Sequence, residues 1–127
     1  MHADDKRLNE LSGVVIGCAF TVLNTLGIRF LETVYENALA YEVRKAGLGL
    51  TRQRGITVLY DGVVLGECFV DLMVEEWLLV ELKTVRALAA GHRAQCISYP
   101  KATGLRLCLL LNFGRPRLAI RRVAHGR

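Results

Sequence analysis

The sequence predicts an α/β fold in which a mixed central sheet is flanked by helices, in the order α-α-β-β-β-α-β-β. Apolar residues recur at helical spacing through the first third of the chain and form short strand-like runs afterwards. The 127 residues are 52% hydrophobic and 23% charged, which suits one packed domain and excludes global disorder. No linker, repeat or low-complexity run divides the chain, so we expect a single domain over residues 1–127.

Two helices are expected at the N-terminal end. The first covers residues 8–25, where apolar side chains recur at helical period, and Gly27 is a suitable stop. The second covers residues 30–45 and ends before Gly47. Both helices carry one apolar side, so each is expected to pack against the sheet.

The remaining elements are five strands and one further helix. Strands are expected over residues 51–60, 63–74, 77–84, 105–112 and 117–123. The dipeptide Asp61-Gly62 is typical of a two-residue hairpin turn between the first two strands. The helix covers residues 87–102, and Pro100 should end or kink it because proline lacks the backbone N–H. The last strand is basic and is expected at a sheet edge.

Composition narrows the classes of partner. The net charge is +5, and residues 101–127 carry bases but no acid, which favours nucleic acid as a partner. The alternative is that these basic residues only protect a solvated strand edge from pairing with another strand. The four cysteines form no CxxC pair, so we expect no zinc site and a reducing, cytoplasmic location. The apolar-rich run 13–26 is too short for a membrane span, and the mean hydropathy of +0.29 instead favours a covered surface, such as a homo-oligomer.

The segment VDLMVEEWLLVELK, residues 70–83, places charges in the most apolar part of the chain. Glu81 and Lys83 are two residues apart on one strand and therefore share a face. A two-residue turn after Val74 would place Asp71 on the other face, whereas a three-residue loop would pair Asp71 directly with Glu81. The charged pattern favours the three-residue loop if these residues form a site.

Two carboxylates that face each other across a ladder repel unless a cation lies between them. Oxygen ligands favour Mg²⁺ or Mn²⁺. Lys83 could hold a phosphate oxygen or activate a water molecule. The alternative is a structural Glu–Lys bridge, which is a common arrangement on strands.

Two helical segments carry further candidates. Glu32 and Tyr35 share one face of the second helix, which places Glu32 at the margin of its buried side. Gln95 and Tyr99 share a face of the third helix, with His92 one turn earlier. Each candidate has an ordinary alternative. Glu32 could be a first-turn acid favoured by the helix dipole. His92, Gln95 and Tyr99 could form an ordinary polar side of the third helix.

Together these segments resemble the GxxExxY family of the PD-(D/E)xK nuclease superfamily. The resemblance rests on FLETVYENALAYEVRKAGL, VDLMVEEWLLVELKTV and HRAQCISYPKATGLRLCLLLNFG, and it covers nearly the whole chain. It implies a restriction-endonuclease-like core. The sequence departs from the family at Arg29, where the family has the glycine of its motif, at Pro100, and at Leu23 in place of a histidine.

The resemblance also implies roles for particular residues. Asp71, Glu81 and the backbone carbonyl of Leu82 would bind the metal, Lys83 would be the catalytic lysine, Glu32 the helix acid, and Gln95 with Tyr99 the accessory pair. We expect Tyr35, His92 and Lys101 to assist substrate binding. The implied activity is Mg²⁺- or Mn²⁺-dependent hydrolysis of nucleic acid, with DNA expected ahead of RNA.

Two other functions remain open. The chain could bind nucleic acid or act as an accessory protein without turnover, or it could be an interaction module that oligomerises through its apolar surface. If it binds nucleic acid, the basic C-terminal strand should do so weakly and without sequence preference, because no base-reading motif is visible.

Overall fold

The computed structural model describes residues 3–88 and 107–124. Its elements are α1 (Ala3–Leu26), α2 (Glu32–Lys45), β1 (Leu50–Tyr60), β2 (Val63–Val74), β3 (Leu78–Lys83), β4 (Leu107–Asn112) and β5 (Ala119–Ala124). The mixed α/β class and the described strands are confirmed, with ends shifted by a few residues. The expected third helix lies outside the described residues, and so do His92, Gln95, Tyr99, Pro100 and Lys101.

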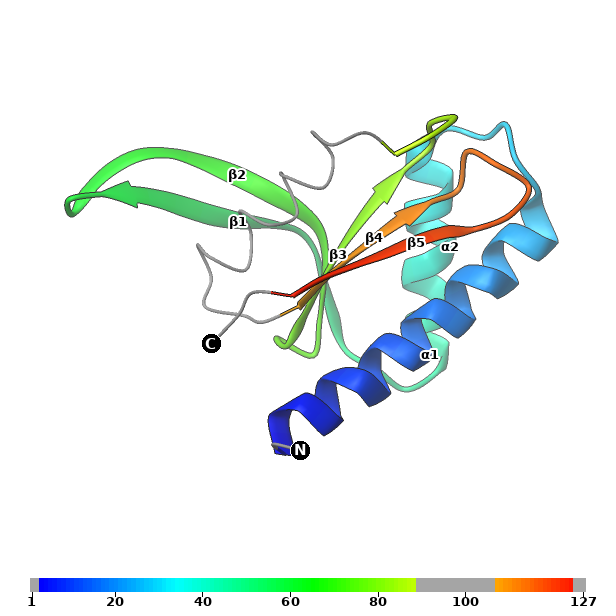
Figure 1. Cartoon of the computed structure of the whole chain (residues 1–127), viewed down its shortest axis with the longest axis horizontal. Helices are drawn as coiled ribbons and strands as arrows, with labels where there is room; N and C mark the ends of the chain where they lie inside the picture. The colour runs from blue at the N-terminus through cyan, green and yellow to red at the C-terminus, as the bar shows by residue number, and fades with distance from the viewer. Residues whose placement is uncertain (1–2, 89–106, 125–127) are drawn as a thin grey trace.

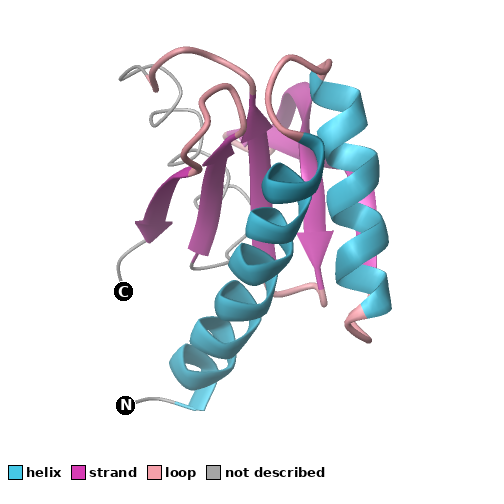
Figure 2. Ribbon diagram, turned by 90° about the vertical axis from the view of Figure 1, so that its right-hand side faces the viewer, coloured by secondary structure: helices cyan, strands magenta, loops and turns pink. Residues whose placement is uncertain are grey.

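The five strands form one sheet in the order β1-β2-β3-β4-β5, with β5 at an edge as expected. Only the β3–β4 pair is parallel, and the other neighbours are antiparallel. Both described helices cover the same face of the sheet (Figures 1 and 2). Alternate residues of β3 and β4 therefore enter two separate cores, one beneath the helices and one on the opposite face.

The helix α1 is longer than the sequence pattern predicted. Its stretch Asp5–Leu26 is long and apolar enough to cross a membrane by length and composition, with a mean hydropathy of 1.2. However, one apolar side of the helix is buried against α2 and the sheet, namely Leu8, Leu11, Val15, Ala19, Val22 and Leu23. This packing accounts for the hydropathy of the helix.

The hairpin of β1 and β2 turns where the sequence predicted. Asp61 and Gly62 both have positive φ, 53° and 77°, as a type I′ turn requires. The distal half of the hairpin extends away from the rest of the sheet (Figure 1). The register shifts between Val58 and Leu59, so a bulge moves β1 by one residue relative to β2.

The turn from β2 to β3 is a three-residue loop. Val74 pairs with Leu78, and Leu72 pairs with Val80. The next residues along this register are Asp71 and Glu81. The three-residue alternative from the sequence is therefore correct.

The end of β3 is fastened by the buried side chain of Asn112 on β4. Its Oδ1 accepts the backbone N–H groups of Val85 and Gly114, both at 3.0 Å, and its Nδ2 donates to the Val85 carbonyl at 2.8 Å. The N–H of Phe113 donates to the carbonyl of Lys83 at 2.8 Å. A Cβ at Gly114 would lie 2.3 Å from the Val85 carbonyl oxygen, so only glycine fits there. These contacts fix where the strand that carries Lys83 ends.

Removing the Asn112 amide should therefore destabilise the whole domain. We expect Asn112→Ala to lower the free energy of unfolding by about 3 kcal/mol, because it leaves buried backbone groups without partners. Urea unfolding measures the change. Asn24→Ala, at an exposed position of α1, is the control and should stay within about 0.5 kcal/mol of the parent. Equal unfolding midpoints for the two variants would contradict this role for Asn112.

Candidate active site

Asp71 and Glu81 meet where β2 begins to separate from β3. Instead of a backbone ladder, two side-chain bonds join the strands at this point. The N–H of Asp71 donates to Glu81 Oε1 at 2.9 Å, and the N–H of Leu82 donates to Asp71 Oδ2 at 2.8 Å. Each carboxylate thus accepts a backbone N–H from the opposite strand, which holds both acids side by side.

The strand β2 also changes faces at Asp71. Val70 and Leu72 are two residues apart, so a regular strand would place them on one face. Instead, Val70 packs in the core opposite the helices, whereas Leu72 packs beneath them. This irregularity frees the backbone of Asp71 from the ladder and lets its N–H bond to Glu81.

Glu32 and Lys83 complete the charged cluster. Glu32 is the first residue of α2 and is half-buried. Burial raises the pKa of Glu32, the negative charge of Asp71 raises it further, and Lys83 lowers it. These interactions show that Glu32, Asp71 and Lys83 lie within electrostatic reach of one another, with Glu32 at the helix side of the cluster.

The cluster contains more acidic than basic side chains. Burial and the neighbouring charge of Asp71 raise the pKa of Glu81 to about 8, although the Asp71 N–H and Lys83 oppose the shift. Burial also raises the pKa of Asp71, although the Leu82 N–H and the Gln53 amide lower it. Lys83 alone therefore does not compensate the two acids, and a bound cation would.

The donor set fits a hard divalent cation. Carboxylate oxygens such as those of Asp71 and Glu81, and a backbone carbonyl such as that of Leu82, are the ligand types that Mg²⁺ and Mn²⁺ prefer. Among residues 3–88 and 107–124, no three His, Cys, Asp or Glu side chains converge as a ready metal cluster. Asp71 Oδ2 and Glu81 Oε1 each accept a backbone N–H from the opposite strand.

Two neighbours of the cluster, Glu36 and Gln53, are absent from the sequence prediction. Gln53 Nε2 donates to Glu36 Oε1 at 2.8 Å and to Asp71 Oδ1 at 3.2 Å. Arg52 binds the other oxygen of Glu36 through Nε and Nη2, at 3.1 and 2.8 Å. Gln53 thus links Asp71 to α2, and Arg52 neutralises Glu36.

The position of Gln53 depends on the shape of β1. Its φ of 49° interrupts the strand opposite Asp71, between the pairs Arg52–Leu72 and Arg54–Val70. Glu36 follows Glu32 by one helical turn, so both acids point to the same side of α2. That spacing was the one signal in the sequence that could have identified Glu36.

Tyr35 does not line the surface of the site. Its side chain is fully buried, and its hydroxyl donates to the Gly27 carbonyl at 2.6 Å and accepts the Phe30 N–H at 3.3 Å. Any role of Tyr35 as an accessory residue is therefore indirect, because its ring belongs to the core and its hydroxyl bonds to the preceding loop. His92, Gln95, Tyr99 and Lys101 lie outside the described residues.

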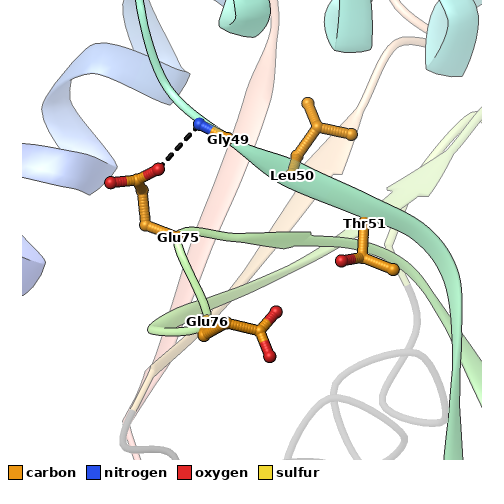
Figure 3. Close-up of a pocket in the computed structure, with 5 residues that line it drawn as sticks. All are labelled: Gly49, Leu50, Thr51, Glu75 and Glu76. Atoms are coloured by element: carbon orange, nitrogen blue, oxygen red, sulfur yellow. Dashed lines mark hydrogen bonds between the residues drawn. The ribbon is translucent and has the colours of Figure 1, made fainter.

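A separate cleft of about 340 Å³ lies near the β2–β3 turn and is not part of this cluster. Its lining residues are Gly49, Leu50, Thr51, Glu75 and Glu76 (Figure 3). Glu75 accepts the Gly49 N–H at 2.7 Å and pairs with Arg7, while Glu76 pairs with Arg54. Its acids already have partners.

The raised pKa of Glu81 predicts a pH-dependent stability when no metal is present. The folded chain holds the Glu81 proton up to about pH 8, whereas the unfolded chain releases it near the ordinary value of 4.5. The stabilisation is therefore complete below about pH 4.5 and is lost as the pH rises to 8. Urea unfolding in EDTA should show a loss of about 3 kcal/mol between pH 5 and 8. Glu81→Gln should remove most of this loss, and parallel profiles for parent and variant would contradict the assignment.

Comparisons with known proteins agree with this geometry. The sequence model of the PD-(D/E)XK nuclease superfamily matches residues 9–123. No curated protein matches the chain. The crystal structure of SSO0001 is similar with a TM-score of 0.60 and 13% identity, over 76% of this chain and 51% of that chain. An alkaline exonuclease from Laribacter hongkongensis, LHK-Exo, gives a TM-score of 0.54 and 13% identity, over 99% of this chain and 73% of that chain.

At these identities the two structures establish a shared fold, and this chain spans about half the length of the first. The superfamily model supplies the stronger link, because it covers the paired carboxylates, the lysine and the helix acid together. PD-(D/E)XK nucleases generally use divalent metal ions, which agrees with the uncompensated acids at Asp71 and Glu81. The match of the superfamily model over residues 9–123 shows that this chain belongs to the PD-(D/E)XK nuclease superfamily.

Proposed function

We propose that this chain is a metal-dependent nuclease that hydrolyses phosphodiester bonds at the cluster of Asp71, Glu81 and Lys83. The observation that carries the proposal is the pairing of two partly buried carboxylates across β2 and β3, with a lysine beside them, in a nuclease fold. A buried pair of acids costs stability without a cation, so a purely structural role explains this arrangement poorly.

Asp71, Glu81 and the carbonyl of Leu82 would hold Mg²⁺ or Mn²⁺. When bound, the ion supplies positive charge that neutralises the phosphate and favours ionisation of a nearby water. The backbone bonds at Asp71 Oδ2 and Glu81 Oε1 orient both carboxylates. In addition, Gln53 holds Asp71 Oδ1 from the side of α2.

Lys83 would orient the attacking water or stabilise the charge that develops on the phosphate. The water oxygen forms the new bond to phosphorus, the bond to the leaving oxygen breaks, and the leaving oxygen gains a proton. Glu32 is the carboxylate placed to accept a hydrogen bond from water at the helix side of the site. Burial and the charge of Asp71 raise the pKa of Glu32 above its ordinary value, which makes it a better proton acceptor than a free carboxylate.

The substrate is proposed to be nucleic acid, with DNA ahead of RNA. Arg115, Arg117 and Arg121 are exposed near β5 and could contact backbone phosphates. Arg122 is already engaged, because it donates to Ser12 Oγ at 2.7 Å and to Asn9 Oδ1 at 2.8 Å. Phosphate contacts of this kind predict weak binding that declines as salt rises.

Three finer assignments are proposals. Membership of the GxxExxY family is supported by the left-handed φ of 84° at Arg29, because that family has glycine there. A cytoplasmic location is supported by the free thiols of Cys18, Cys68 and Cys108. A homo-oligomer would cover the exposed apolar side chains of the distal β1–β2 hairpin.

Substitution of Lys83 tests the catalytic role. Lys83→Ala should lower cleavage at least about 100-fold, because it removes the group that acts on water or phosphate. Stabilisation by Mg²⁺ should persist, because Lys83 is not a proposed ligand. Cleavage of plasmid, single-stranded DNA and RNA is measured beside the melting temperature with and without Mg²⁺. Lys45→Ala, an exposed position at the far end of α2, is the control and should cleave like the parent.

A structural role for Lys83 gives a different pattern. The variant would then lose about 3 kcal/mol of stability that Mg²⁺ does not restore. If the parent cleaves none of the substrates with any divalent ion but still binds nucleic acid, the chain is a non-catalytic binding protein and the nuclease proposal fails.

Gln53 should influence the metal site without contacting the metal. We expect Gln53→Ala to weaken Mn²⁺ binding about 10-fold, because Asp71 loses the amide that orients its Oδ1. Titration of Mn²⁺ measures the change directly. Thr51→Ala, at an exposed position of the same strand, should bind Mn²⁺ like the parent. Equal Mn²⁺ affinity in both variants would show that Gln53 has no orienting role.

A further inference from the structure

The loop between α1 and α2 contains an arginine in a backbone conformation that favours glycine. Arg29 has φ of 84°, within the left-handed region that side chains with a Cβ adopt only at a cost. Gly27, two residues earlier, has φ of 71° and shows that the loop does use glycine where the chain ends α1. A non-glycine residue in this strained backbone conformation is a reason to look for a function at that position.

Contacts from Tyr35 hold the loop in this conformation. The Tyr35 hydroxyl bonds to the carbonyl of Gly27 at 2.6 Å and to the N–H of Phe30 at 3.3 Å, so it fixes both ends of the turn. The Phe30 ring packs edge-on against the Tyr35 ring with centroids 6.2 Å apart. Arg29 therefore lies in a short loop segment between Gly27 and Phe30, and these two residues cannot move apart without breaking their hydrogen bonds to the Tyr35 hydroxyl.

The same tyrosine ties the loop to the candidate active site. Its ring stacks on Phe113 with centroids 5.0 Å apart, and the Phe113 N–H donates to the Lys83 carbonyl. On the other side, the loop leads directly into Glu32 of the charged cluster. The loop and the end of β3 consequently lie at the same end of the sheet (Figure 1).

The Arg29 side chain has no polar partner within the described part of the chain. It is exposed and makes no hydrogen bond or ion pair with residues 3–88 or 107–124. Glu32 is influenced by Asp71, Lys83 and Glu36 but not by Arg29, which therefore does not neutralise the helix acid. Within residues 3–88 and 107–124 no group occupies its guanidinium, so this part of the chain leaves it open to an approaching anion.

We infer that Arg29 binds a backbone phosphate of the nucleic-acid strand, next to the phosphate that is cleaved. A guanidinium forms charge-assisted bonds to phosphate oxygens, and the pinned loop presents it beside Glu32 with little freedom to lose on binding. Because Arg29 makes no ion pair with the carboxylates of the described residues, it adds affinity and sets the position of the strand without acting on the attacking water. This inference rests on the proposed function, since it assumes that the cluster acts on nucleic acid.

Two substitutions separate the charge of Arg29 from its backbone strain. Arg29→Gln keeps a side chain with the same backbone cost but removes the charge, whereas Arg29→Gly removes both the charge and the cost. Arg44→Gln removes one charge from an exposed position in the last turn of α2, at the opposite end from Glu32, and serves as the matched control. Binding of a labelled single-stranded and a duplex DNA oligonucleotide is measured with Ca²⁺ present in an Lys83→Ala background, so that cleavage does not interfere.

Both Arg29 variants should bind about 3- to 10-fold more weakly at low salt, and the slope of affinity against salt should fall by about one phosphate contact. Arg44→Gln should bind like its Lys83→Ala background. The melting temperature of Arg29→Gly should be unchanged or higher by up to about 4 °C, because relief of the strained φ offsets the greater freedom of unfolded glycine. In the catalytically active background, the loss should appear mainly in KM.

The outcomes distinguish this inference from the proposed function. If the parent binds DNA but both Arg29 variants bind equally well, the role of Arg29 is overturned and the proposed function stands. If Arg44→Gln loses as much affinity as Arg29→Gln, the effect is one of net charge and the inference also fails. If the parent binds neither oligonucleotide, the proposed function and the inference fall together.

Discussion

The arrangement of the site depends on the exchange of backbone bonds between Asp71 and Glu81. Each carboxylate accepts an N–H from the other strand, so two side chains join β2 to β3 where the regular ladder stops. Because the strands no longer pair along their backbones beyond this point, β2 can turn away and change the face that it presents. The same bonds keep the two acids together where burial raises the pKa of both, and the charge of Asp71 raises the pKa of Glu81 further.

The surrounding side chains neutralise Glu36 but leave Asp71 and Glu81 without full charge compensation. Arg52 and Gln53 satisfy Glu36, which is buried on α2 beside the cluster. Asp71 and Glu81, in contrast, receive only N–H donors and the partial compensation of Lys83. Asp71 and Glu81 are therefore the acids that lack a full compensating positive charge, whereas the buried Glu36 on α2 is paired with Arg52.

Local patterns predicted much of this arrangement, because they depend on spacing alone. The Asp61-Gly62 dipeptide predicted the first turn and the strand pattern predicted the limits of β2, whereas the three-residue loop was one of two alternatives, favoured if Asp71 and Glu81 form a site. Gln53 was not predictable, because strict pairing from the hairpin turn would place Val70 opposite it. The bulge between Val58 and Leu59 shifts the register by one and brings Asp71 there instead. The burial of Tyr35 was not predictable either. Helical spacing shows that Tyr35 shares a side of α2 with Glu32, but it does not show how deeply the ring is buried.

The structure separates the contacts that build the site from the groups that would act in it. The loop before α2 and the end of β3 are fixed by buried partners, namely the Tyr35–Phe113 stack and the amide of Asn112. Lys83 lies at the end of β3, and Arg29 lies in the loop before α2. The hydrogen bonds that fix these two segments do not involve the side chain of either residue. Charge at positions 29 and 83 can therefore change with little effect on the fold, whereas loss of the Tyr35 hydroxyl or the Asn112 amide would move both groups relative to Asp71 and Glu81. A substitution that removes the Tyr35 hydroxyl should then impair binding and catalysis together, although it contacts neither substrate nor metal.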